Sequence, residues 1–91
     1  MNLCIPRIKS NITKEYLKKK LCNLQLFGKI EKIIEIPLKN DNTYKRILIK
    51  INWYNNENSK KFQETIKKMG SINYVYEFPW YWKLLITNHK V

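Results

Sequence analysis

Residue types that catalyse reactions or bind metals are scarce in this sequence, and they are scattered along it. Cys4 and Cys22 show no metal-ligand spacing, and the only aspartate and the only histidine are Asp41 and His89. The two glycines stand alone, so the chain has no glycine-rich phosphate loop. A nucleophile with its base, or a metal site, needs several such groups close together. We therefore expect a protein that is not an enzyme, has no catalytic residues and uses no metal or cofactor.

Positive charge is the most prominent chemical property of the chain. It has 18 lysines and arginines against 7 acidic residues, a formal net charge of +11, which is typical of proteins that bind nucleic acids. Lysine, isoleucine and asparagine are abundant and alanine is absent, a bias that an A/T-rich genome produces without selection for binding. Arginine, the residue best suited to bidentate phosphate contacts, occurs only as Arg7 and Arg46. The charge alone therefore supports nucleic-acid binding only in part.

Length and hydrophobicity indicate one folded domain. A chain of 91 residues with 44% hydrophobic residues is long enough for a single core and too apolar for general disorder. No stretch reaches the roughly 20 apolar residues of a membrane-spanning helix, and the first residues lack the basic-then-apolar order of a signal peptide. We expect a soluble intracellular protein that does not contact membranes.

The spacing of apolar residues predicts six elements in the order strand, helix, strand, strand, helix, strand. The strands are expected at residues 2–7, 29–37, 44–53 and 72–77, and the helices at residues 14–26 and 59–69. Thr13 is a suitable N-cap for the first helix, and Gly70 is a suitable end for the second. Ile30 and Ile33 cannot both alternate with the isoleucines that follow them, which predicts a β-bulge in the second strand.

Two strand–helix–strand halves of this size are expected to form one α+β domain. Right-handed crossovers place both helices on one face of a four-stranded antiparallel sheet and leave the other face open. In this order of elements the chain resembles the RNA recognition motif (RRM), a ferredoxin-like fold. The segment 3–8 (Leu-Cys-Ile-Pro-Arg-Ile) resembles the family's first-strand hexamer, and the segment 44–51 (Tyr-Lys-Arg-Ile-Leu-Ile-Lys-Ile) resembles its third-strand octamer. The resemblance covers about residues 2–77 of a single domain over residues 1–91, and it leaves residues 78–91 as an aromatic C-terminal extension.

Several short segments are similar to one subset of that family, the small RRM-like proteins of large double-stranded DNA viruses, or giant viruses. These segments are Cys4–Ile8, Tyr44–Arg46, Trp53 and Pro79–Trp82. The A/T-rich bias of the composition fits the same source. The resemblance implies a viral protein located in the cytoplasm of an infected host cell or in the virion.

The resemblance also implies where a ligand would bind, on the open face of the sheet. The family stacks RNA bases on aromatic rings at the second hexamer position and at the third and fifth octamer positions. Those positions hold Cys4, Arg46 and Leu48 here, and none of them is aromatic. Arg46 and Lys50 flank Leu48, where we expect them to hold a phosphate or a base edge; the alternative is a solvated basic face. The predicted nucleic-acid contacts are Cys4, Arg7, Lys45, Arg46, Leu48 and Lys50.

The aromatic segment Trp80-Tyr81-Trp82, which follows Pro79, allows four interpretations. Its rings could cover the open sheet face, supply the stacking surfaces that the strands lack, or anchor a protein partner. They could also pack on the protein's own core, which is the interpretation that we favour. Alternation would place Trp80 and Trp82 on one side of the segment and Tyr81 on the other, so that some rings are structural and others are available.

The sequence thus leads to two functional hypotheses from different classes. The first is a non-catalytic protein that binds RNA or another single-stranded nucleic acid through the open sheet face, with weak sequence specificity because the stacking rings are missing. The alternative is a protein–protein interaction module on the same scaffold, which would use the sheet face or the aromatic segment. The lysine runs on the two helices are interpreted as solvated faces.

Overall fold

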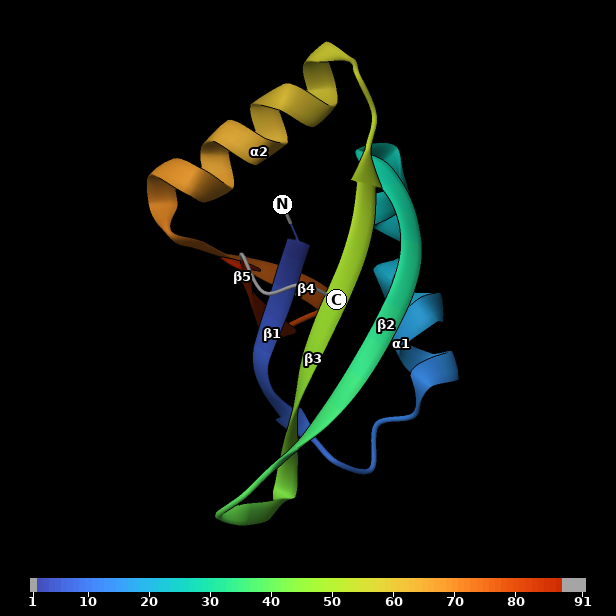
Figure 1. Cartoon of the computed structure of the whole chain (residues 1–91), viewed down its shortest axis with the longest axis vertical. Helices are drawn as coiled ribbons and strands as arrows, with labels where there is room; N and C mark the ends of the chain where they lie inside the picture. The colour runs from blue at the N-terminus through green and yellow to red at the C-terminus, as the bar shows by residue number, and fades with distance from the viewer. Residues whose placement is uncertain (1, 88–91) are drawn as a thin grey trace.

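A computed structural model describes residues 2–87. Within them the chain forms an α+β domain with a five-stranded antiparallel sheet, two α-helices and one 3-10 helix (Figure 1). In chain order the elements are β1 (Asn2–Lys9), α1 (Lys14–Lys20), η1 (Leu21–Leu26), β2 (Gly28–Leu38), β3 (Asp41–Trp53), α2 (Glu57–Met69), β4 (Ser71–Glu77) and β5 (Trp80–Thr87). The order of strands across the sheet is β2-β3-β1-β5-β4. The sequence also favours a frayed end from Thr87 to Val91, but Thr87 belongs to β5, and the rest of that segment, with His89, lies outside the described residues.

The sheet has one strand more than the four that the sequence predicts. β4 and β5 form a hairpin joined by the turn Phe78-Pro79, whose peptide bond is cis. β5 lies next to β1 inside the sheet, so β4 is displaced to the edge. The prediction of an extension beyond the last strand is therefore wrong for residues 80–87. Pro79 lies in the turn between β4 and β5, where its missing N–H costs no bond of the ladder, so it separates two strands of the same sheet.

The core lies between one face of the sheet and the two helices. Along β3, Ile47, Ile49 and Ile51 point to this face and are buried. They belong to one cluster with Leu17 of α1 and Ile66 of α2, so both helices cover the same face of the sheet. Burying a side chain of this size contributes roughly 1.5–3 kcal/mol. The other face, called the outer face below, carries no helix from the described part of the chain (Figure 1).

Local signals in the sequence set the ends of the helices. The Thr13 hydroxyl accepts a hydrogen bond from the N–H of Tyr16 at 3.1 Å, which confirms the predicted cap. Gly70 ends α2 with a φ of 80°, the left-handed conformation that glycine adopts most easily. The helix predicted at residues 14–26 is α-helical only to Lys20 and continues as the 3-10 helix η1. No helix among residues 2–87 is long and apolar enough to cross a membrane.

The β-bulge predicted in the second strand is confirmed. Ile30 and Lys32 of β2 oppose the neighbouring residues Ile51 and Lys50 of β3, so Glu31 is the extra residue. The bulge lets Ile30 and the later core-facing residues of β2 point to the same side.

A second bulge lies in β1 and includes a proline. The register of β1 against β3 shifts between Ile5 and Ile8, and Pro6 in this interval cannot donate to the ladder. On its other side β1 pairs with β5 only over Asn2 to Cys4. Beyond that point β1 and β5 are no longer paired, which leaves an opening at one end of the sheet.

Candidate nucleic-acid interface

The outer face is built from side chains that alternate with the core residues. Its centre is an apolar row that crosses four neighbouring strands, from β2 through β3 and β1 to β5. The row consists of the cross-strand partners Ile34, Leu48, Cys4 and Leu85. Because directly opposed residues on one face of a sheet have their Cβ atoms about 5 Å apart, these side chains form a continuous strip.

Basic side chains lie on both sides of the apolar row. Lys32 and Lys50 are cross-strand partners on one side of it. Arg46 lies on the other side, and alternation along β5 places Lys83 on the same face. All four side chains are exposed. Within residues 2–87, Lys50 has an ion pair with Glu31 at 3.8 Å and the other three have none, so they are available to a ligand.

Four of the predicted contact residues come together on this face: Cys4, Arg46, Leu48 and Lys50. Cys4 and Leu48 oppose each other directly and are only 7% and 5% exposed. The middle of the row therefore lies below the surrounding side chains, and a ligand that approaches the face contacts the longer basic side chains first. The half-buried ends of the row offer more apolar surface.

The Cys4 thiol is unreactive in this position. Burial raises the pKa of Cys4 above its ordinary value of 9.0, and the nearby Arg46 guanidinium opposes that shift with a smaller effect. A neutral thiol is a weak nucleophile and a poor metal ligand. Cys4 therefore contributes apolar surface, whereas Cys22 is exposed on η1.

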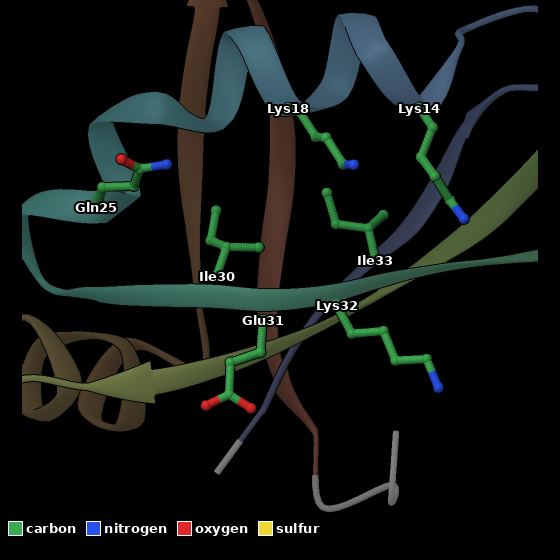
Figure 2. A pocket seen from close by; sticks show the side chains of 7 residues that line it. All are labelled: Lys14, Lys18, Gln25, Ile30, Glu31, Lys32 and Ile33. Carbon is green, nitrogen blue, oxygen red and sulfur yellow. The ribbon is translucent and has the colours of Figure 1, made fainter.

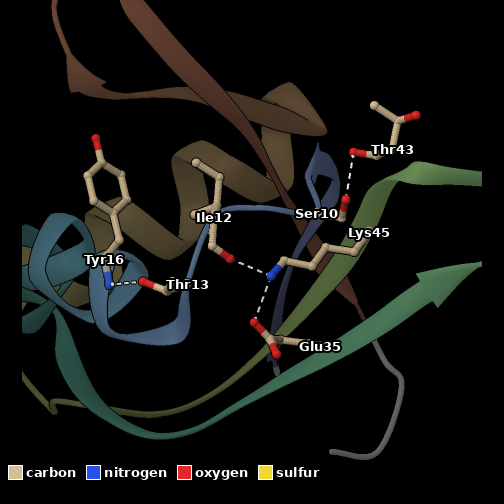
Figure 3. Close-up of polar contacts among 7 residues, drawn as sticks. All are labelled: Ser10, Ile12, Thr13, Tyr16, Glu35, Thr43 and Lys45. Atoms are coloured by element: carbon tan, nitrogen blue, oxygen red, sulfur yellow. Dashed lines mark hydrogen bonds and ion pairs between the residues drawn. The ribbon is translucent and has the colours of Figure 1, made fainter.

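Lys45 is the predicted contact residue that the structure places on the other face of the sheet. Its side chain is buried on the helix-facing side of β3, although Arg46 follows it directly in the sequence. The ammonium group donates to the backbone carbonyl of Ile12 and to the Glu35 carboxylate, the latter at 2.7 Å (Figure 3). These bonds connect β3 to β2 and to the loop before α1. Lys45 precedes the inward-facing Ile47 by two residues, so the alternation along β3 contained the signal for this placement.

Arg7 lies at the end of the sheet, within the bulge of β1. Its guanidinium lies over the Tyr44 ring, 4.0 Å from the ring centroid, and donates to the Asp41 carboxylate at 3.3 Å. Arginine has five N–H donors, so these contacts orient the group without exhausting its donors. Arg7 is therefore an oriented cation at the end of the sheet and not part of the central group.

The three aromatic residues at the start of β5 have different surroundings. Trp82 is buried, with its ring stacked on Tyr76 at 4.0 Å and in edge contact with Tyr16 at 6.4 Å. Trp80 and Tyr81 are 65% and 55% exposed. Packing on the protein's own core therefore describes Trp82 alone. Alternation along β5 places Tyr81 on the outer face, and because β5 is a strand of the sheet, residues 80–87 do not lie across that face.

Several grooves border the sheet, and two of them bear on the outer face. The first, of about 430 Å³, lies between α1, η1 and the edge strand β2. Figure 2 shows Lys14 and Lys18 reaching from α1 toward the apolar side chains of β2, with Glu31 on the far side of the strand. Its lining combines Lys14 and Lys18 on the helix side with Lys32 of the outer face and with the Glu31 carboxylate. The groove therefore borders the outer face at the edge strand and has charges of both signs.

The second groove, called the end groove below, lies where β1 and β5 separate. It is lined by Arg7 and Lys9 of β1, Tyr44 of β3, Tyr76 of β4, and Trp80 and Trp82 of β5, together with the loop before α1. The sequence did not predict this groove, because it depends on a fifth strand that was not expected.

Neither a metal site nor a similarity to known proteins points to a function for this surface. Within residues 2–87, no three His, Cys, Asp or Glu side chains come together in a way that could hold a metal ion. No protein-family model matches the chain, and neither curated proteins nor solved structures give a significant match. The functional conclusion therefore rests on the residues of this chain alone.

Proposed function

We propose that this protein is a non-catalytic, RRM-like domain that binds RNA or another single-stranded nucleic acid through the outer face, with weak sequence specificity. The observation that carries the proposal is the apolar row from Ile34 to Leu85, which crosses four strands and has basic side chains on both sides. A single strand presents apolar base faces and anionic phosphates side by side, so this surface complements it in both respects.

Arg46 supports the proposal most directly. It is exposed, and no hydrogen bond or ion pair within residues 2–87 engages its guanidinium. It stands beside the apolar row, opposite Ile36 of β2. A guanidinium can hold a phosphate through two parallel N–H bonds or lie flat on a base. A ligand could therefore bind to Arg46 without breaking a hydrogen bond or an ion pair among residues 2–87.

Weak sequence specificity follows from the side chains at the centre of the face. The Cys4 thiol and the aliphatic Leu48 side chain can contact any base equally well, because they do not form hydrogen bonds that distinguish one base from another. Tyr81 offers an exposed ring on β5. Since each stacked base contributes about 1–3 kcal/mol, a face with few rings depends more on its phosphate contacts.

The salt dependence of RNA binding tests the proposal. If Lys32, Arg46, Lys50 and Lys83 neutralise roughly four phosphates, the logarithm of the association constant falls with log salt with a slope near −3. Raising the salt from 50 to 200 mM then weakens binding about 50-fold. The measurement is the fluorescence anisotropy of a labelled, mixed-sequence RNA of about 12 nucleotides, a length within the range of single-strand sites.

A duplex of the same RNA is the matched control. Its bases are paired and stacked, so they cannot lie on the apolar row, and we expect the duplex to bind more weakly than the single strand. No binding of the single strand by micromolar protein in low salt would contradict the proposal. Equal affinity for duplex and single strand would reduce it to general attraction between a basic protein and a polyanion.

A second candidate function, a protein-interaction module, is favoured by exposed aromatic side chains around the β4–β5 turn. Phe78 is 89% exposed, and the exposed Trp80 and Tyr81 follow it closely in the sequence. Tyrosine and tryptophan are frequent hot spots of protein interfaces. A pull-down with the Phe78→Ala/Tyr81→Ala variant distinguishes the two functions. Loss of a partner in this variant, together with no RNA binding by the unmodified protein, would favour the interaction module.

A further inference from the structure

The end groove exists because β1 and β5 stop pairing. The two strands pair over Asn2 to Cys4 of β1, and the bulge at Pro6 follows. The resulting groove is lined by β1 and β3 on one side and by the β4–β5 hairpin on the other, and its volume is about 430 Å³. Ligand sites in proteins commonly measure roughly 300–1,000 Å³, so the groove is large enough for a small ligand or for one unit of a polymer.

The wall on the side of the β4–β5 hairpin is aromatic. Tyr76 and Trp82 stack with 13° between their ring planes, and Trp82 is buried, so this pair forms a fixed part of the wall. Trp80 also lines the groove, yet most of its surface is exposed, and it makes no ring contact with another residue in the described range. An exposed indole beside a groove offers a large flat surface on which a planar ligand can stack.

The wall on the side of β1 is cationic. Arg7 is oriented by Tyr44 and Asp41, and Lys9 is exposed with no ion pair within residues 2–87. Asp41 offsets part of the Arg7 charge, but none of the described residues that line the end groove is itself acidic. The groove beneath α1 differs, because its lining includes Glu31. The end groove therefore favours an anionic ligand.

A nucleotide is the ligand class that uses both walls. An apolar peptide would stack on Trp80 but leave Lys9 without a counter-charge, and a free inorganic anion would use the cations but not the ring. Tyr44 connects the groove to the outer face, because it is two residues from Arg46 on the same side of β3. Trp80 lies on the other side of the sheet, since it shares the helix-facing side of β5 with Trp82. A single strand that follows β3 on the outer face would therefore reach Trp80 through the opening where β1 and β5 are no longer paired.

We propose that the end groove holds one nucleotide of the bound single strand, with its base on Trp80 and its phosphate against Lys9 and Arg7. The proposal rests on the function proposed above and adds a nucleotide subsite outside the central part of the outer face. It assigns the exposed tryptophan of β5 the stacking role that no aromatic residue fills at Cys4 and Leu48.

Substitutions at the β4–β5 turn test this subsite. Trp80→Ala is expected to bind the labelled RNA about 5- to 150-fold more weakly, the loss that corresponds to one stacked base. Trp80→Phe keeps a ring and should retain most of the affinity. Phe78→Ala is the matched control, because Phe78 is an exposed aromatic residue of the same turn that does not line the groove. It should bind as the unmodified protein does.

A second variant tests the cationic wall without touching a ring. Lys9→Ala removes one phosphate contact, so the slope of the salt dependence should become less steep by about 0.7. Circular dichroism establishes that each variant is folded. If Trp80→Ala does not fold, Lys9→Ala decides the question, because the exposed Lys9 side chain takes no part in the core.

The outcomes separate the subsite from the function on which it rests. Equal affinity of Trp80→Ala and Phe78→Ala, with weaker binding by Arg46→Ala, would overturn the subsite and leave the proposed function standing. An unchanged salt slope in Lys9→Ala would likewise count against the subsite. If the unmodified protein binds no RNA in low salt, the proposed function fails and the subsite fails with it.

Discussion

The two faces of β3 differ in how they hold their charged side chains. On the helix-facing side, the ammonium group of Lys45 is buried and bonded to the Ile12 carbonyl and the Glu35 carboxylate. On the outer side, the next residue, Arg46, is exposed and has no side-chain partner among residues 2–87. The sequence predicted a ligand contact for both. The difference teaches that the face of the strand, more than the charge, determines whether a cation stabilises the fold or remains available for a ligand.

The largest effect is expected from the helix-facing side of β3. Ile49 is fully buried, so Ile49→Ala should lower the free energy of unfolding by about 2–5 kcal/mol, through lost burial and the cavity that remains. Ile36 on the outer face is half-buried, and Ile36→Ala should cost only about 1 kcal/mol. Urea titrations followed by circular dichroism measure both values.

Equal losses in these two variants would break the comparison, because they would show that the outer face is packed as tightly as the core. If Ile49→Ala does not fold, Ile49→Val is the graded substitute, with an expected cost of about 0.5–1.5 kcal/mol.

The next largest effect is expected at Lys45. Lys45→Met keeps the apolar stem but removes both hydrogen bonds, and it should lower the free energy of unfolding by about 1–3 kcal/mol. The Glu35 carboxylate is partly exposed, so water can replace some of what it loses. RNA affinity should stay within about twofold, since the side chain does not reach the outer face. An unchanged urea midpoint, or a marked loss of RNA affinity, would contradict the structural role.

Arg46 should show the opposite pattern. Arg46→Ala is expected to weaken RNA binding about 3- to 10-fold and to reduce the salt slope by about 0.7, while stability changes by no more than about 0.5 kcal/mol. Lys67→Ala is the matched control, because it removes the same charge from an exposed position of α2. Equal effects of the two variants on RNA binding would show that net charge matters and position does not.

The smallest effect is expected from titration at alkaline pH. Burial raises the pKa of Cys4 above 9.0 and the pKa values of Tyr16 and Tyr74 above 10.0; for Tyr16 the Glu77 carboxylate adds to the shift. The unfolded chain loses these protons first and binds fewer of them than the folded protein, so stability should fall as the pH rises through this window.

Urea midpoints between pH 7.5 and pH 10.5 measure this decline, which should be absent in the lower part of the range, where these groups keep their protons in both states. Cys4→Ala removes the contribution of the thiol, so the decline of stability should begin nearer to pH 10, where Tyr16 and Tyr74 of the unfolded chain lose their protons. A midpoint that rises with pH would show that these protons are not retained in the folded state.

Much of the fold could be predicted where one residue type sets the pattern. The isoleucines of β3 alternate without interruption, and those of β2 break the alternation at the position where the bulge lies. Thr13 and Gly70 have the side-chain oxygen and the backbone freedom that a helix start and a helix end require. These features are determined by residues that are close in the sequence, which is why they could be predicted from it.

The fifth strand and the end groove depend on contacts between distant residues. The residues after Glu77 were expected to form an extension, because the sequence does not say whether Pro79 lies beyond the last strand or in the turn between two strands. Lys83 was missed for the same reason, since it belongs to the unexpected strand. Lys45 was the avoidable error, because alternation from Ile47 already places it on the inner side. The near-complete burial of Leu48 on an open face depends on its neighbours across the sheet and could not be read from its own segment.

The position of β5 has a consequence for how the chain folds and for whether it tolerates truncation. Asn2 pairs with Thr87, so the middle of the sheet joins the start of the first described strand with the end of the last one. Contacts of such long separation in sequence form late, because the intervening chain must first be ordered. Until β5 follows, β1 has an unpaired edge, and open edges pair readily with other chains. Removal of residues 80–87 should therefore yield a protein that self-associates along β1, and not a smaller working domain.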